Sequence, residues 1–436
     1  MSDHGSCHEG EPPPTANRRW FCLHAGAAAF SLGLVQTFVP MLAIRLGANN
    51  PQLGLLSALP NLLTIPALLL SSRLFTAGRK RVWIRRATLL ARAGFLLLAG
   101  VPALPASMRV GALILVWALA MAGEGVAYTG IQGLVADAFG PVSRGRVLAE
   151  RGRYGTLAGL SAGLLAGILL DRLPFPAGYQ GIFGAAGLLV AVELWLIRRL
   201  PEPEIPVDGP GAPPEAPAAG APVAPAERSW SGRRWQVSGA VVRFFAASAL
   251  LHLTWQSLWP VFSRYQITDL GANNTWVSLL NVTNSLGAAG TYNLWARWGE
   301  RWGHRRMLVA AGCILSLAPL TNVLFPSLPA VAVFNLVTGS SIAGVTLLVA
   351  ALLMEVAPVE SRSRILAAHQ AMVAAIGTVA PLLGAWLMDA LTARGALILG
   401  FFLRFGLGVG AFAALEWWET RRGVTHLGSR KAPVRL

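Results

Sequence analysis

Apolar runs of about 20 residues recur along the whole chain, separated by short polar stretches. A run of that length crosses the roughly 30 Å hydrocarbon core of a bilayer as a helix, and a helix satisfies its own backbone hydrogen bonds in lipid. Six such segments come first, at about Trp20–Leu42, Leu53–Ser72, Ala87–Leu104, Gly111–Ala136, Val147–Leu170 and Tyr179–Ile197. Six more follow at about 238–262, 274–295, 306–325, 329–355, 364–388 and 395–417. The pattern predicts an all-α membrane protein with twelve transmembrane helices.

Composition argues against a soluble protein. Of the 436 residues, 54% are hydrophobic and only 13% are charged, and the mean hydropathy is +0.54. A Pro/Ala/Gly-rich stretch divides the two sets of segments and has no means of building a core. We expect a disordered cytoplasmic tail at 1–19, a six-helix bundle at 20–200, a cytoplasmic linker at 201–235, a second six-helix bundle at 236–418 and a basic cytoplasmic tail at 419–436.

The net charge of +16 is distributed unevenly. Most of the 36 Lys and Arg residues lie on one alternating set of loops, tails and helix ends, which is the positive-inside signature of the cytoplasmic side. A nucleic-acid surface would instead gather its charge on one soluble face, so nucleic acid is not an expected partner. The distribution predicts a multi-pass protein of the cell (inner) membrane with both termini in the cytoplasm.

The chain contains one stretch twice, because Leu134–Asp171 and Leu352–Asp389 align without a gap. Each copy has a carboxylate that closes one apolar run, a Ser-Arg-x-Arg turn, and a run rich in small residues that ends in aspartate. The matched landmarks are Asp137 with Glu355, then Ser143, Arg144 and Arg146 with Ser361, Arg362 and Arg364, and finally Asp171 with Asp389. Two large halves that repeat in the same order indicate a duplicated membrane fold.

Further landmarks repeat near the first segment of each half. LGANN at 46–50 returns at 270–274, and Pro40 with Gln36 before it returns as Pro260 with Gln256. Parallel six-helix halves joined by a cytoplasmic linker resemble the major facilitator superfamily over most of the chain. The resemblance implies two parallel-repeat six-helix bundles that move a small molecule through a central cavity by rocking against each other.

The strongest family-type motif lies between the eighth and ninth segments. It resembles the superfamily's inner-loop motif, with Glu300 in the place of the acid, Arg301 in that of the arginine, Gly303 at the turn and Arg305 in the basic pair. Glycine lets the chain reverse within a few residues, the acid favours a neighbouring helix N-terminus, and the basic residues stay at the anionic leaflet.

The resemblance implies a conformational latch that holds the cytoplasmic faces of the two halves together in one state. The repeated turn arginines are assigned to the same latch: Arg144, Arg146, Arg362 and Arg364. An ordinary positive-inside loop is the alternative interpretation. The equivalent loop of the first half has lost the motif, since Phe75 and Thr76 stand in the places of the acid and the arginine.

Glu124 lies in the middle of the fourth segment, and a charge at that depth costs about 3 kcal/mol or more when it is unpaired. The resemblance places Met121 where the superfamily's fourth segment carries an arginine, and Glu124 where it carries a glutamine. One hypothesis is that Glu124 itself carries a proton or meets the substrate. The alternative is a structural salt bridge, with Arg92 or Arg243 as the partner.

Polar and aromatic side chains also gather on segments that line the central cavity in the superfamily, or next to them. The cavity or substrate candidates are Gln36, Tyr128, Gln132, His252, Trp255, Gln256, Trp259, Asn281, Asn284, Asn335 and Thr338. Hydrogen-bonded core residues are the alternative interpretation, above all for His252. Arg404, in the twelfth segment, has no partner that the sequence makes evident.

Glycine patterns in two segments allow two interpretations. The fifth segment repeats glycine every four residues from Gly155 to Gly167, which is typical of close helix packing. In the eleventh, Gly377, Pro381 and Gly384 resemble the glycine–proline motif that the superfamily's exporters carry in segment five, although here it stands in the other half. This pattern favours efflux only weakly, and close packing alone also explains it.

No nucleotide-binding loop, zinc-ligand spacing or nucleophile elbow is present, so we expect no enzyme, cofactor or metal site. The sequence predicts a proton-coupled secondary transporter of a small organic solute, amphipathic or weakly basic, with a lean toward efflux. An uptake permease for a sugar or organic acid is one alternative, and a transport-inactive sensor or assembly factor on the same scaffold is another. The expected partners are the lipid bilayer, a small-molecule substrate and protons, and the chain is expected to act as a monomer.

Overall fold

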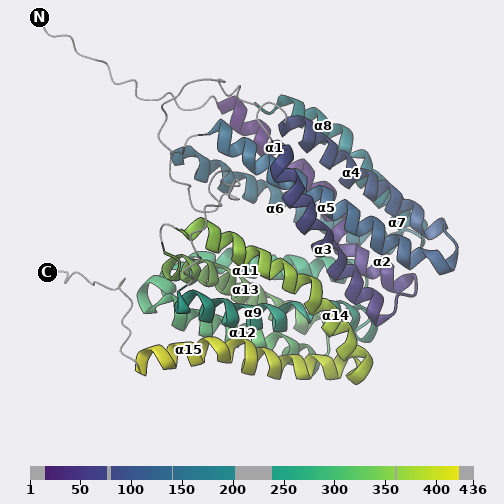
Figure 1. Cartoon of the computed structure of the whole chain (residues 1–436). Coiled ribbons are helices and arrows are strands. Elements are labelled where there is room, and N and C mark those ends of the chain that lie inside the picture. Colours follow the sequence, from purple (N-terminus) through teal and green to yellow (C-terminus); the bar gives the residue numbers. More distant parts are fainter. Residues whose placement is uncertain (1–14, 76–79, 140, 202–237, 359–360, 422–436) are drawn as a thin grey trace, which may run out of the picture.

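The computed structural model describes residues 15–75, 80–139, 141–201, 238–358 and 361–421 (Figure 1). These residues form helices joined by short turns. Most of the expected linker at 201–235, and most of both expected tails, lie outside the described residues.

The first half makes six crossings. They are α1 (Thr15–Val35) with η1 (Gln36–Phe38) and α2 (Val39–Arg45); α3 (Asn50–Leu74); α4 (Lys80–Gly100) with η2 (Val101–Ala103); α5 (Ala106–Ala138); α6 (Pro141–Arg172); and α7 (Ala177–Leu188) with α8 (Val190–Arg199).

The second half repeats this plan. Its crossings are α9 (Gly239–Gln256) with α10 (Trp259–Arg264) and η3 (Tyr265–Asp269); α11 (Asn274–Trp302); α12 (His304–Leu324); α13 (Leu328–Val356); the first part of α14 (Arg362–Leu403); and the rest of α14 with η5 (Arg404–Val409) and α15 (Gly410–Arg421). Every segment that the apolar pattern predicts overlaps one of these helices.

By length and composition, nine spans in the described part of the chain can cross a membrane. One of them, Arg364–Trp417, covers two crossings, because Thr392 takes a left-handed φ of +68° and divides α14. The seventh crossing is broken into α9, α10 and η3, and α11 carries several asparagines, so neither is counted among the nine. The helices therefore amount to the twelve crossings that the sequence predicts.

The repeated Gln–Pro spacing marks a helix break in each half. A proline has no N–H, so Pro40 and Pro260 leave the carbonyls of Gln36 and Gln256 without their usual helical donors. In the first crossing the α-helix stops before Gln36 and resumes after η1, and in the seventh α9 ends at Gln256 and α10 begins at Trp259. The same local chemistry thus bends equivalent helices.

Each half encloses a hydrophobic core of its own. Phe38, Phe95 and Phe183 are fully buried in the core of the first half. Phe244 and Leu348 belong to a separate cluster in the second half. The two bundles meet near α2, α3 and α14 and diverge toward the end of the molecule where α1 begins and α15 ends (Figure 1). We call that end the basic side, since the arginine-rich start of α4 and the α11–α12 turn lie there, and the opposite end the far side.

The halves pack mainly through two helix pairs, α3 with α14 and α6 with α11. At the far side, Asn50 Nδ2 donates to Asp389 Oδ1 at 2.8 Å. In the second pair, the backbone N–H and Nδ2 of Asn274 donate to Asp171 Oδ1 at 3.0 and 2.8 Å, and the Thr275 N–H donates to Asp171 Oδ2 at 2.8 Å. We call these two contacts the far-side clasps.

The far-side clasps are built from the repeated residues. Each joins the aspartate that ends one copy of the long repeat to the last asparagine of the LGANN copy in the other half. The Asp389 clasp is the weaker one, because Pro51 follows Asn50 and has no N–H to donate, whereas Thr275 follows Asn274. A single pseudo-twofold arrangement therefore gives two contacts of unequal strength.

Next to the far-side clasps, along the same two helix pairs, the halves approach closely. Ser278 Oγ donates to the Gly163 carbonyl at 2.9 Å, and a Cβ on Gly167 would lie only 2.5 Å from that Oγ. In the other pair, Asn61 Nδ2 on α3 donates to the Gly377 carbonyl on α14 at 3.1 Å. Pro381 frees that carbonyl by lacking an N–H. The glycines and the proline of both motifs thus have packing roles.

Candidate functional site

A buried cluster of three charged side chains lies inside the first half. Arg92 on α4 donates from Nε and Nη2 to the two carboxylate oxygens of Glu193 on α8, at 2.7 and 3.0 Å. Its Nη1 donates to Glu124 Oε2 on α5 at 2.7 Å. The Ala28 carbonyl on α1 accepts a further contact from Nη2 at 3.3 Å. The guanidinium thereby joins four helices of the bundle.

The cluster has an unbalanced charge. Two carboxylates share one guanidinium, so the three groups carry one net negative charge when all are ionised. The side chains of Arg92 and Glu193 are each 1% exposed, whereas that of Glu124 is 21% exposed. A buried charge is stable only when paired and hydrogen-bonded. A proton or a cation would balance the excess charge, and Glu124 is the most exposed member of the cluster.

The Glu124–Arg92 contact is the ion pair that the sequence offered as an alternative to a functional role. A proton-carrying role for Glu124 is compatible with that pair and stays a prediction. Sequence reasoning missed Glu193, although the signal was present: a carboxylate within the sixth apolar segment is as costly as the one in the fourth. Arg243, the other suggested partner, lies on α9 in the second half.

The second half holds a pair of histidines joined by one serine. Ser248 Oγ lies 2.8 Å from His369 Nε2 and 3.3 Å from His252 Nδ1, and the same Nδ1 lies 2.8 Å from the Ser248 carbonyl. The two imidazole centroids are 5.9 Å apart. His252 was a sequence candidate, whereas His369 was missed, although it occupies the repeat position of Arg151. His252 also packs beside Trp255, with centroids 6.0 Å apart.

The remaining cavity candidates divide by exposure. Tyr128 is 60% exposed and Trp259 is 43% exposed, and Gln36 is exposed as well. Gln256 is buried and its Nε2 approaches the Val373 carbonyl on α14 at 3.5 Å. Gln132 Oε1 lies 3.5 Å from Arg151 Nη1 on α6. Gln132 and Gln256 thus contact a neighbouring helix of their own half.

The amide-rich candidates lie on the packed pair α11 and α13. Asn335 Nδ2 donates to the Leu280 carbonyl at 3.1 Å, and Thr338 Oγ1 donates within its own helix to the Phe334 carbonyl. Asn281 is exposed, and a Cβ on Gly339 would lie 1.8 Å from the Asn284 carbonyl. Asn335 and Asn284 therefore lie at a close contact between α11 and α13, whereas Asn281 is exposed.

The proposed latch residues lie at the basic side. Gly303 has a φ of +92° between α11 and α12, a conformation that glycine adopts without strain. Glu300 and Arg301 are exposed, and the Arg301 guanidinium lies 5.5 Å from the Trp302 ring centroid. Arg305 is half-buried.

The turn arginines differ in exposure. Arg144 Nη2 donates to the Ala136 carbonyl at 2.6 Å, at the end of α5. Arg362 is half-buried, and Arg146 and Arg364 are exposed. The hydrogen bond from Arg144 to Ala136 therefore stays within the first half.

The carboxylates that match in the repeat bind basic residues within their own half. Lys80 Nζ lies 2.6 Å from Asp137 Oδ2, joining the start of α4 to the end of α5. His304 Nδ1 lies 2.5 Å from Glu355 Oε1, joining the start of α12 to the end of α13. The repeat thus conserves a basic-side brace in each bundle.

Replacing Glu300 with glutamine tests the latch. Glu300→Gln is expected to shift the balance between forms open at the basic side and at the far side, because the latch requires its carboxylate only when the basic side is closed. Labelling of an introduced basic-side cysteine measures the shift. Glu355→Gln is the matched control, since its partner lies in the same half. Labelling equal to that of the wild type would rule out the latch.

Arg404 has a structural setting that the sequence left open. It is 1% exposed, and its Nη1 and Nη2 donate to the carbonyls of Leu315 at 3.0 Å and Trp255 at 3.3 Å. Trp255 stands just before the break between α9 and α10. Arg404 therefore ties that break to α12 and the last crossing.

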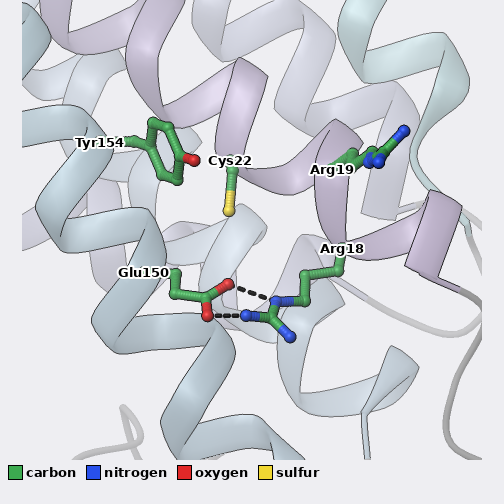
Figure 2. Close-up of a pocket in the computed structure, with 5 residues that line it drawn as sticks. All are labelled: Arg18, Arg19, Cys22, Glu150 and Tyr154. Atoms are coloured by element: carbon green, nitrogen blue, oxygen red, sulfur yellow. Dashed lines mark hydrogen bonds and ion pairs between the residues drawn. The ribbon is translucent and has the colours of Figure 1, made fainter.

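A pocket of about 280 Å³ opens between α1 and α6 near the basic side. Figure 2 shows Arg18 of α1 paired with Glu150 of α6, with Cys22 and Tyr154 pointing into the space between the two helices and Arg19 directed away. Across the described residues, no group of three or more His, Cys, Asp or Glu side chains gathers as a metal site.

Comparison with known proteins agrees with the duplicated twelve-crossing fold. The family model of the Major Facilitator Superfamily matches residues 21–252 and again 244–435. The chain belongs to the Major Facilitator Superfamily and is a membrane transporter of that type. Over 88 residues it is 34% identical to YncC of Bacillus subtilis (strain 168), which is named for metabolite transport. That match spans 20% of this chain and 19% of YncC.

Solved structures share the fold at low identity. A bacterial homologue of the iron transporter ferroportin, in an inward-facing state, has a TM-score of 0.67 at 13% identity over 91% of this chain and all of that chain. A POT family transporter in complex with 5-aminolevulinic acid has a TM-score of 0.66 at 13% identity, over 94% of this chain and 96% of that chain. A bacterial homologue of the lysosomal transporter Spinster, inward-facing and unoccupied, has a TM-score of 0.63 at 15% identity. That match covers 97% of this chain and 100% of the Spinster homologue. At such identities the likeness carries the fold alone.

Proposed function

We propose that the chain couples the movement of a small organic solute to that of protons, through alternating access of a central cavity. The observation that carries the proposal is the Arg92–Glu193–Glu124 cluster, whose excess negative charge lies inside the first half and whose partly exposed member is Glu124. Intramembrane carboxylates with partial access are typical of proton relays. A proton that binds Glu124 would change the charge of the bundle interior.

The far-side clasps support the rocking step. Contacts that close one side through hydrogen bonds between rigid bundles can break as a unit, while each bundle keeps its own core. We assign the basic side to the cytoplasm because it is rich in arginine, as cytoplasmic loops of membrane proteins are. We also propose that both termini are cytoplasmic and that the membrane is the inner one. The bundles at 20–200 and 236–418 are then the bodies that move, and the chain acts as a monomer.

Replacing Glu124 with glutamine tests the coupling. Glu124→Gln keeps the shape of the side chain but can neither release nor take up a proton. We expect solute accumulation driven by a pH gradient to fall to passive equilibration, while exchange at equal pH persists. The measurement is flux in liposomes that hold the purified protein, with a panel of radiolabelled organic amines, organic acids and sugars.

The matched control is Asp269→Asn, an exposed carboxylate on the second half, for which gradient-driven flux should be retained. Glu193→Gln distinguishes the two buried carboxylates, and flux that survives in it assigns the proton to Glu124. Wild-type flux that ignores the pH gradient would eliminate proton coupling. Absence of flux for the whole panel would favour the sensor or assembly factor instead.

For the direction of transport, we propose efflux. Efflux rests on the Gly377–Pro381–Gly384 pattern, and packing accounts for it: a Cβ on Gly384 would lie 1.7 Å from the Ser257 carbonyl. A second candidate function, uptake of an organic acid, is favoured by Arg151, which is buried in the first half without a carboxylate partner among the described residues. Loading the solute inside or outside the liposomes separates the two directions.

A further inference from the structure

Arg151 on α6 is a buried cation with few acceptors. The residue is 7% exposed, and its Nε is buried without a hydrogen-bond partner. Its Nη1 makes only a long 3.5 Å contact with Gln132 Oε1. Within the part of the chain that the structure describes, Arg151 forms no ion pair. A guanidinium in such a place normally has a carboxylate or several carbonyls around it.

None of the described side chains that lie within electrostatic range of Arg151 is a carboxylate. His24 on α1 is 6% exposed, both of its ring nitrogens are buried without a partner, and it lies within electrostatic range of Arg151. Tyr128 and Cys22 lie within the same range of the guanidinium. Tyr128 is 60% exposed, so one member of the group is open to a ligand.

The nearby carboxylates are already engaged elsewhere. Glu150, the residue before Arg151, is paired with Arg18, and Glu124 and Glu193 are paired with Arg92. The corresponding position of the second half offers a contrast, because His369 has Ser248 as its partner at 2.8 Å. Of the two positions that the repeat relates, His369 has a short hydrogen bond to a partner, whereas Arg151 has only the long contact with Gln132.

We propose that Arg151, with His24, Gln132 and Tyr128, forms a subsite for the anionic group of the transported solute, a carboxylate or a phosphate monoester on a small organic molecule. The planar guanidinium can donate two parallel hydrogen bonds to either group. The Tyr128 hydroxyl and a protonated ring nitrogen of His24 supply further donors. This proposal rests on the transport function proposed above, and it replaces the weakly basic solute that the aromatic and amide-rich candidates favour.

The pocket near the basic side gives the subsite a neighbour that solvent reaches. Cys22 lines that pocket and also lies within electrostatic range of Arg151, so the pocket and the subsite are neighbours. Arg18 and Arg19 lie on the α1 side of the pocket (Figure 2).

The test is binding of four probes of similar size and different charge to the full-length protein in phosphatidylcholine nanodiscs. Benzoate and phenyl phosphate are anions, benzamide is neutral and benzylamine is a cation. Isothermal titration is carried out on the wild type, Arg151→Gln, Arg151→Lys and Arg153→Gln. Arg153 is the matched control, because it lies on the same helix and is exposed.

We expect at least one anion to bind the wild type at least about tenfold more tightly than benzamide, because a hydrogen bond to a charged group contributes about 1.5–3 kcal/mol. Arg151→Gln should lose about 10- to 100-fold in anion affinity. Arg151→Lys should keep part of it, and Arg153→Gln should keep all of it. Anion binding that is unchanged in Arg151→Gln, absent from the wild type or weaker than benzylamine binding would overturn the proposal.

Thermal stability without ligand separates binding from folding. An arginine that serves only the fold lowers the melting temperature when it is replaced, whereas removal of an uncompensated buried cation should leave it unchanged or raise it. A clear drop for Arg151→Gln together with an equal loss of affinity for all four probes would refute the subsite.

A lipid headgroup could supply the same phosphate chemistry. The titrations are therefore repeated in nanodiscs that contain phosphatidylglycerol, where unchanged benzoate affinity supports a solute. Stabilisation by phosphatidylglycerol that depends on Arg151, without benzoate or phenyl phosphate binding, would overturn the assignment to a solute. These binding experiments involve no pH gradient, so the subsite and the proton coupling can fail independently.

Discussion

Arg92→Gln is expected to lower the free energy of unfolding by about 3–5 kcal/mol, because it leaves two carboxylates in the bundle without their shared cation. The loss of Arg92 costs most at Glu193, because that side chain is only 1% exposed and both of its oxygens accept hydrogen bonds from Arg92. Chemical or thermal unfolding of the purified protein in detergent measures the effect. A variant that accumulates poorly can be compared by thermal stability in membranes.

The controls for Arg92 follow from the charge count of its cluster. Arg86→Gln removes an exposed arginine from the same helix and should change stability little. Glu193→Gln leaves a balanced pair of Arg92 and Glu124, so it should be milder than Arg92→Gln. The double variant Arg92→Gln/Glu193→Gln should recover part of the loss. Equal stability of Arg92→Gln and Arg86→Gln would show that the cluster does not hold the bundle together.

Asp171→Asn is expected to shift the protein toward forms open at the far side by about tenfold or more. The substitution removes a carboxylate that accepts three hydrogen bonds from Asn274 and Thr275 at the start of α11, where the helix dipole also favours a negative charge. Each bond to a charged group contributes about 1.5–3 kcal/mol, which is enough to move a conformational equilibrium by that factor.

The unequal far-side clasps make this prediction specific. Asp389→Asn should shift the balance less than Asp171→Asn, because Asp389 accepts one bond from the Asn50 side chain. Distances between spin labels on Ala106 and Ser327, exposed residues in far-side turns of the two halves, report the opening. Asp269→Asn, an exposed far-side aspartate, is the control. Identical distance distributions for Asp171→Asn and Asp269→Asn would contradict a gating role.

The two predictions concern different parts of the transport cycle. The Arg92 cluster lies within one bundle and sets the charge of its interior, whereas the far-side clasps lie between bundles and, in the proposed mechanism, determine which side is closed. A change at one should leave the other intact, since the hydrophobic core of the first half holds its helices together in either state. Coupling between solute and proton would require a link between the two, and the Glu124→Gln flux measurements address that link.

The sequence by itself determined the membrane class, the twelve crossings, the duplication and the family, and it identified the residues of both far-side clasps as repeats. It could do so because the length of an apolar run and a repeated motif are local properties of the chain. It also placed Glu124 at a depth where a charge needs a partner, and named Arg92 among the possible partners.

Only the tertiary structure decided which polar residues meet. Glu193 joins Arg92, His369 joins His252 through Ser248, and Asp171 binds Asn274 rather than a residue of its own half. These pairings depend on how far each helix is rotated about its axis and on which helix lies beside it. Apolar periodicity fixes neither quantity in a membrane, because lipid and helix interior are both apolar and nearly every face of such a helix is hydrophobic.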